Sequence, residues 1–193
     1  MKVSIVSLIV GSLIAAVLIF FWGFVFWAQV TAPEWALKGV PEEHLEEVNV
    51  AVRNLEHGTY ITPFQGQVEG ESPEGWMDRH REGPLMMLSV VPDGAKPMEM
   101  TGMIQGFVHG WIAAFTAAIV LAMAAPALPA YGQRFAFVLM LGAFTTIWAE
   151  PAHSIWWWRT CGASTWFAFY GMGAWLVAAI ALAAFVKVPV RKP

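Results

Sequence analysis

The chain has 193 residues, of which 58% are hydrophobic and 13% are charged, and its formal net charge is −3. A soluble domain carries about 25% charged residues, so this composition indicates a protein whose solvent is largely a lipid bilayer. The weak net charge argues against nucleic-acid binding, and a single cysteine, Cys161, excludes an internal disulfide and a multi-cysteine zinc cluster.

Four apolar segments predict four transmembrane helices in one all-α membrane domain, residues 1–193. We expect spans at about 3–28, 102–125, 135–157 and 163–186. Each is long enough to cross the hydrocarbon core of a bilayer, which takes about 20 helical residues. The first span exceeds the apolar core of a signal peptide, about 7–15 residues, so we expect it to be retained rather than cleaved.

Residues 30–99 form an acidic insert between the first two spans, with 13 of the 14 acidic residues and 5 basic ones. Apolar residues at helical spacing predict an amphipathic helix over 41–55. Apolar runs bounded by Gly and Pro predict short strands at 59–62 and 85–91. The Gly-rich stretch 66–75 predicts a loop, so the insert is expected to be a small α+β unit.

The distribution of charge predicts the orientation of the chain in the membrane. The segments opposite the insert carry basic residues and no acidic ones: Lys2, Arg134, Lys187, Arg191 and Lys192. The positive-inside rule then places both termini in the cytoplasm. We expect a bacterial inner-membrane protein with residues 30–99 in the periplasm and Arg159 in a short outer loop. The chain is rich in tryptophan, and Trp156–Trp158 are expected in the outer interfacial belt.

The second span carries a small residue at every fourth position: Gly102, Gly106, Gly110, Ala114 and Ala118. Small side chains let two helix backbones approach closely in lipid, where van der Waals contact drives association. We expect this face to pack against the Ala-rich fourth span. Contact with another subunit is the alternative.

Ionisable side chains at membrane depth are costly and are therefore candidate functional groups. Gln105 and His109 share one face of the second span, and Glu150 and His153 share one face of the third. His109 lies 21 residues before, and Glu150 20 residues after, the centre of the connecting turn near residue 130. At about 1.5 Å per residue the two lie at nearly equal depth, so we expect that they can pair.

Several ligands fit these polar residues. A metal ion could bind His109, Glu150 and His153, and two histidines on neighbouring helices could ligate haem. The same residues with Gln105 could bind a quinone head group or relay protons. No diagnostic spacing such as HxxxH or HExxH is present, so no catalytic residue is identified and no cofactor is required. The alternative is a buried Glu–His pair that cross-links the helical hairpin.

Short sequence fragments resemble a family of small bacterial inner-membrane proteins. The fragments are Gly58-Thr-Tyr60, Gly83-Pro84-Leu85, Pro92-Asp-Gly94 and Trp166-Phe-Ala-Phe-Tyr170. Members of that family have four helices and an extracytoplasmic insert after the first. No activity is assigned to the family, so the resemblance implies topology and carries over no functional residue.

The expected function is that of a non-catalytic accessory subunit in a larger bacterial membrane complex, of respiratory or photosynthetic electron-transfer type. Its partners would be membrane lipid, other membrane subunits and a basic periplasmic protein attracted by the acidic insert. One alternative is a metal-, haem- or quinone-binding membrane enzyme that uses His109, Glu150 and His153. The other alternative is an oligomeric transporter or channel.

Overall fold

The computed structural model describes residues 3–188 and contains four long helices. They are α1 (Ile5–Phe24), α4 (Met100–Ala124), α5 (Tyr131–Trp156) and α6 (Cys161–Phe185). A π-helical turn, η1 (Val25–Gln29), continues α1. All four are long and apolar enough to cross a membrane, as predicted for the four spans.

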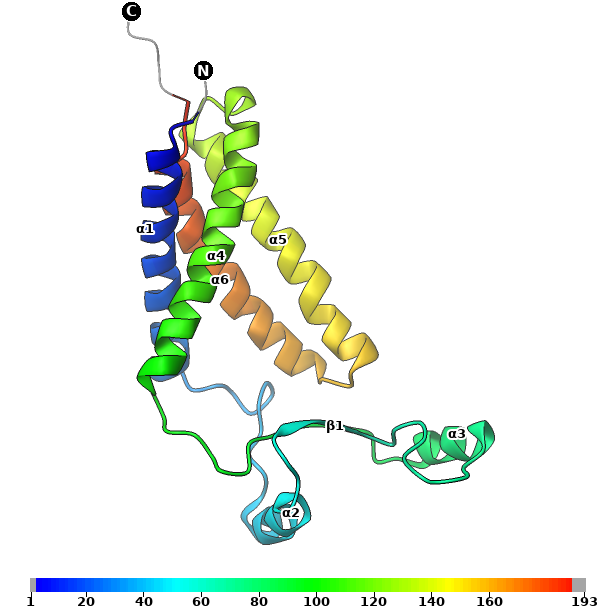
Figure 1. Ribbon diagram of the computed structural model, residues 1–193. Helices are drawn as coiled ribbons and strands as arrows, with labels where there is room; N and C mark the ends of the chain where they lie inside the picture. Colours follow the sequence, from blue (N-terminus) through cyan, green and yellow to red (C-terminus); the bar gives the residue numbers. More distant parts are fainter. Residues whose placement is uncertain (1–2, 189–193) are drawn as a thin grey trace, which may run out of the picture.

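The contacts between the four helices place them in the order α5, α6, α1, α4. The central pair, α6 and α1, each have two long neighbours. Although a short turn joins α4 to α5, these two helices contact each other at few positions and diverge toward the insert (Figure 1). The arrangement is therefore open between α4 and α5 at the insert end of the bundle.

Close packing depends on small residues that face large aromatic side chains. A Cβ atom added at Gly142 on α5 would lie 2.3 Å from the Trp175 side chain of α6. A Cβ atom added at Gly173 on α6 would lie 2.2 Å from the Trp22 ring of α1, whose Nε1 donates a hydrogen bond to the Tyr170 carbonyl. Both glycines thus set the distance between neighbouring helices.

The small-residue face of α4 packs on a different helix from the one expected. Gly110, Ala114 and Ala118 are buried, and the side chain nearest to Gly110 is Ile19 of α1. Helix α4 contacts α1 at many positions and α6 at few, so the prediction that the fourth span covers this face is wrong. Gly102 and Gly106 are exposed, with no neighbouring atom within 4 Å of an added Cβ.

Arg134 stabilises the end of the bundle opposite the insert. Its side chain is 6% exposed. Nε donates to the Ala183 carbonyl at 2.9 Å, and Nη1 donates to the carbonyls of Leu128 and Pro129 at 3.0 and 2.6 Å. The guanidinium therefore caps the last turn of α6, where carbonyls lack helical partners, and ties it to the turn between α4 and α5.

The insert contains a short 3₁₀ turn, two helices and a two-stranded sheet. The elements are η2 (Glu42–His44), α2 (Leu45–Val52), β1 (Gly58–Thr62), α3 (Pro73–Glu82) and β2 (Met86–Val90). The strands pair antiparallel, with Gly58 opposite Val90 and Thr62 opposite Met86. Both predicted strands are confirmed, and the predicted helix over 41–55 is confirmed in a shorter form.

Helix α3 was not expected, because its first residues fall in the stretch predicted as loop. Its limits are nevertheless encoded locally. Ser72 is the N-cap and accepts a hydrogen bond from the Gly75 amide, Pro73 occupies the first turn, and Gly83 follows the helix with a φ of 72°. The prediction of loop holds only up to Ser72.

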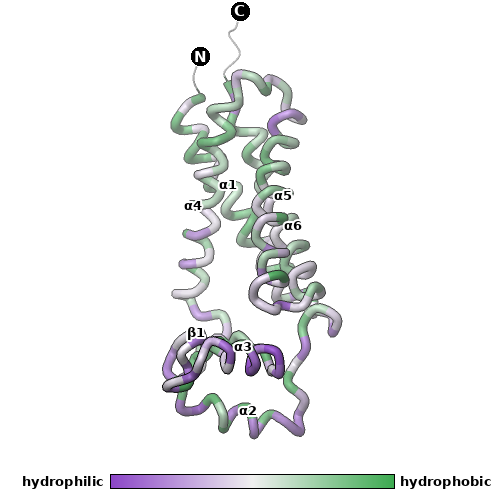
Figure 2. The backbone as a smooth tube through the Cα atoms, turned by 90° about the vertical axis from the view of Figure 1, so that its right-hand side faces the viewer, coloured by the Kyte–Doolittle hydropathy of each residue, from purple (hydrophilic) through white to green (hydrophobic). Residues whose placement is uncertain are grey.

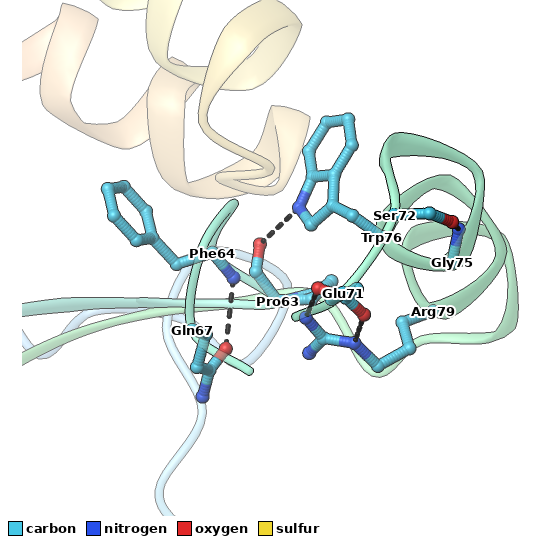
Figure 3. A network of polar contacts seen from close by, with 8 residues as sticks. All are labelled: Pro63, Phe64, Gln67, Glu71, Ser72, Gly75, Trp76 and Arg79. Atoms are coloured by element: carbon cyan, nitrogen blue, oxygen red, sulfur yellow. Dashed lines mark hydrogen bonds and ion pairs between the residues drawn. The ribbon is translucent and has the colours of Figure 1, made fainter. Parts of the chain in front are cut away.

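Polar contacts hold α3 against the loop that precedes it (Figure 3). Arg79 donates through Nε and Nη2 to both carboxylate oxygens of Glu71, and Trp76 Nε1 donates to the Pro63 carbonyl at 3.4 Å. The hydrogen bonds from Arg79 lower the pKa of Glu71 and outweigh the opposing effect of burial. In the folded insert, the Glu71 carboxylate is therefore bound to Arg79 in its ionised form.

The insert reaches the loop between α5 and α6 through aromatic rings. The His80 ring lies 5.4 Å from the Trp76 ring and 5.6 Å from the Trp158 ring, between centroids. Trp158 follows α5, so α3 lies beside the insert end of α5 and α6. Figure 2 shows that the helical bundle is largely hydrophobic and the insert largely hydrophilic.

Candidate functional site: a cavity between α4 and α5

The opening between α4 and α5 is a cavity of about 960 Å³ whose walls come from all four long helices. Most of its surface is apolar. Glycine and alanine on α1, α4, α5 and α6 leave the space free: Gly23, Gly106, Gly110, Ala113, Ala149, Gly171 and Ala174. The lining also includes large aromatic side chains: Phe20, Phe24, Trp27, Phe167, Tyr170 and Trp175.

The π-helical turn η1 lies at the edge of this cavity. Trp27 and Ala28 of η1 belong to the lining. The extra residue in such a turn changes the direction of the side chains that follow it, and π-helical turns occur frequently at functional sites. Phe26, also in η1, turns the other way and packs on Trp166, with 4.6 Å between ring centroids. The turn therefore divides its aromatic residues between the cavity and the core.

His109 and Glu150 face the same cavity from α4 and α5. The two residues were predicted to lie at nearly equal depth and to be able to pair. They do not pair, because α4 and α5 diverge at this depth. Glu150 instead accepts a hydrogen bond from Arg159 Nη1 at 2.9 Å. The Arg159 guanidinium also lies over the Phe167 ring, 4.7 Å from its centroid. Glu150 is thus neutralised from the short α5–α6 loop.

Two further polar groups reach the cavity from α5 and α6. The hydroxyls of Thr146 and Tyr170 have no hydrogen-bond partner among residues 3–188, and neither does the His109 ring. Thr145, by contrast, donates to the Gly142 carbonyl of its own helix at 2.9 Å. The cavity therefore offers free imidazole and hydroxyl groups against an otherwise apolar wall.

The remaining predicted site residues lie elsewhere. Gln105 is exposed on α4 outside the cavity lining, and His153 lies on α5 beyond Glu150, also outside it. Within residues 3–188, no three His, Cys, Asp or Glu side chains gather closely enough to hold a metal ion. The structure therefore does not assemble His109, Glu150 and His153 into a common ligand set.

Sequence reasoning missed Arg159 and Tyr170 as members of the site. Arg159 was assigned to the outer loop, and its separation of nine residues from Glu150 spans a helix end, so no helical periodicity relates the two. Tyr170 belongs to the aromatic segment of α6, which the sequence marks as apolar. A basic residue just beyond a span that contains a lone carboxylate is the signal that identifies such a pair.

Comparisons of the chain with protein-family models, curated proteins and solved structures found no match.

Proposed function

We propose that the protein binds a lipid-soluble amphiphile in the cavity between α4 and α5. The observation that carries this proposal is the cavity's composition at membrane depth: a mainly apolar wall with a few free polar groups. Small-molecule sites have volumes of about 300–1,000 Å³ and this same balance of lining groups. The volume of about 960 Å³ lies in that range.

The position of the polar groups supports an amphiphile rather than a purely apolar ligand. His109 lies nine residues after the start of α4, about 14 Å along the helix, and Glu150 lies six residues before the end of α5, about 9 Å. The polar groups thus lie toward the insert end of the spans. The apolar wall on the other side of the cavity comes from Ile19, Ala113 and Ala174. A polar head group and an apolar tail therefore each have a suitable environment.

The divergence of α4 and α5 supports access from the bilayer. These helices line opposite sides of the cavity and do not contact each other there (Figure 1). A hydrophobic molecule can then reach the site sideways from the lipid, without crossing the aqueous phase or the insert.

Two glycines on α4 provide a matched test. Gly106 lines the cavity and Gly102 does not, and an added Cβ at either meets no atom within 4 Å. Gly106→Leu therefore adds a side chain at the cavity wall with no clash at Cβ, and Gly102→Leu adds the same side chain one turn away. We expect native mass spectrometry to show a hydrophobic molecule bound to the wild type and Gly102→Leu, and lost from Gly106→Leu. Retention by Gly106→Leu, or its absence from wild type, contradicts the proposal.

A second function, that of an accessory subunit in a larger membrane complex, is favoured by the uncovered face of α4. Gly102, Gln105 and Gly106 are exposed on α4, and an added Cβ at either glycine meets no atom within 4 Å. Gln105 is costly against lipid, and Gly102, which lies outside the cavity lining, allows a further helix to approach closely. We expect a particle well above small multiples of 21.3 kDa in mild detergent, and a colourless homo-oligomer contradicts this function.

The insert offers a surface for a soluble partner of that complex. Every residue from Glu42 to Ala51 is exposed, and among the described elements α2 contacts mainly the adjoining turn η2. Isolated helices shorter than about 12–15 residues are marginal in water, so a covering partner would stabilise α2. Because the insert is acidic, we propose a basic periplasmic protein here. Its binding should weaken with salt, and a salt-independent association argues against this partner.

A further inference from the structure

We infer that the amphiphile has an uncharged, planar ring with hydrogen-bonding oxygens and an apolar tail, the chemistry of a quinone or quinol. This inference rests on the proposed function and narrows it. Three properties of the cavity carry it: its balance of charge, its aromatic wall and its free hydrogen-bonding groups.

The charge balance favours an uncharged head group. Among the lining residues, Glu150 is the one carboxylate, and no lysine or arginine belongs to the lining. The nearby Arg159 already pairs with Glu150 and lies over Phe167. An anionic head group such as a phosphate would find no free cation in the lining. Because Glu150 and Arg159 already neutralise each other, a buried phosphate would remain an unpaired charge, which is strongly unfavourable.

The aromatic wall favours a planar ring. The Trp27 ring lies 5.4 Å from the Phe167 ring and 5.5 Å from the Tyr170 ring, between centroids. These three rings come from η1 and α6 and all line the cavity. Aromatic pairs prefer offset or edge-to-face arrangements over about 4.5–7 Å, so a planar guest can extend this group of rings.

The free polar groups suit a ring with oxygens on two sides. His109 belongs to α4 and Tyr170 to α6, so they approach the cavity from different walls. A neutral imidazole both donates and accepts, and a phenol does the same. The pair can therefore bond either a carbonyl or a hydroxyl oxygen, which matches both redox forms of a quinone. Glu150 accepts from Arg159 and keeps the adjacent wall neutral.

The test compares two probes with the same ten-carbon tail, decylubiquinone and decyl phosphate, on the full-length protein in phosphatidylcholine nanodiscs. The readout is the midpoint of thermal unfolding against probe concentration, because a ligand that binds only the folded state raises this midpoint progressively as its concentration exceeds the Kd. We expect decylubiquinone to raise the midpoint and decyl phosphate to leave it unchanged.

Variants assign that binding to the cavity. Replacing His109 with Leu, or Tyr170 with Phe, should weaken binding of decylubiquinone about tenfold, as loss of one buried hydrogen bond does. His109→Gln keeps a donor and an acceptor and should recover most of the affinity. Thr116→Val is the control, because Thr116 lies on α4 outside the lining and bonds the Ile112 carbonyl of its own helix.

The outcomes separate this inference from the proposed function. Equal stabilisation by decyl phosphate overturns the uncharged head group and leaves amphiphile binding in place. If neither probe binds but wild type still carries a molecule that Gly106→Leu loses, the quinone-type ligand is wrong and the cavity remains a binding site. If neither probe binds and no molecule is carried, both proposals fall.

Discussion

Replacing Arg134 tests whether one buried cation holds the open bundle together. Its guanidinium makes three hydrogen bonds, to the carbonyls of Ala183, Leu128 and Pro129. A hydrogen bond that involves a charged group contributes about 1.5–3 kcal/mol, so three bonds set an upper bound of about 9 kcal/mol. Water at the membrane surface can replace part of this, and removing the buried charge also removes its desolvation cost. We therefore expect Arg134→Ala to lower the free energy of unfolding by about 3 kcal/mol.

Arg134→Lys separates charge from geometry. A lysine keeps the positive charge near the end of α6 but cannot reproduce the planar fork that reaches three carbonyls. We expect it to recover about half of the loss. The assay is equilibrium unfolding in mixed micelles, followed by the near-ultraviolet signal of the tryptophans. If Arg134→Ala stays within about 0.5 kcal/mol of the wild type, as an ordinary surface substitution does, the capping role is refuted.

Three further predictions follow from particular contacts. Gly142→Ala should separate α5 from α6 and lower stability by about 1–3 kcal/mol, because the new Cβ would overlap Trp175; unchanged micellar unfolding would contradict this. Because its folded pKa is lowered, chiefly by hydrogen bonds from Arg79, Glu71 should stabilise the insert at neutral pH and lose this effect as pH falls through that pKa. Proteolysis at 66–72 should then increase in acid, and Glu71→Gln should remove this dependence. The exposed Cys161 should react with an impermeant maleimide in intact spheroplasts, and reaction only after lysis would reverse the proposed orientation.

Hydropathy and local turn chemistry predicted the elements well, because both act over neighbouring residues. The four spans and the two strands followed from apolar runs and their boundaries. Helix α3 could also have been predicted, since Ser72, Pro73 and Gly83 provide its caps. It was missed because the Gly- and Glu-rich composition of its first turn suggested a loop, and composition was given more weight than the caps.

The packing of the helices could not be predicted in the same way, because it depends on which distant surfaces fit together. Counting residues from the turn placed His109 and Glu150 at one depth, and both do line one cavity. The count says nothing about the angle between α4 and α5. That angle depends on α4 packing along α1 and on α5 packing along α6, where Trp175 lies over Gly142. For the same reason, Glu150 pairs with Arg159 rather than with His109.

The two proposed functions make different demands on neighbouring turns of α4. A bound amphiphile needs the space beside Gly106, whereas an added helix needs a close approach at Gly102. If the protein has one of these functions and not the other, one leucine variant should have an effect and the other should not. If the protein does both, Gly106→Leu should lose the ligand and keep the large particle, and Gly102→Leu should do the reverse. Loss of both properties in both variants would show instead that the partner helix forms part of the ligand site.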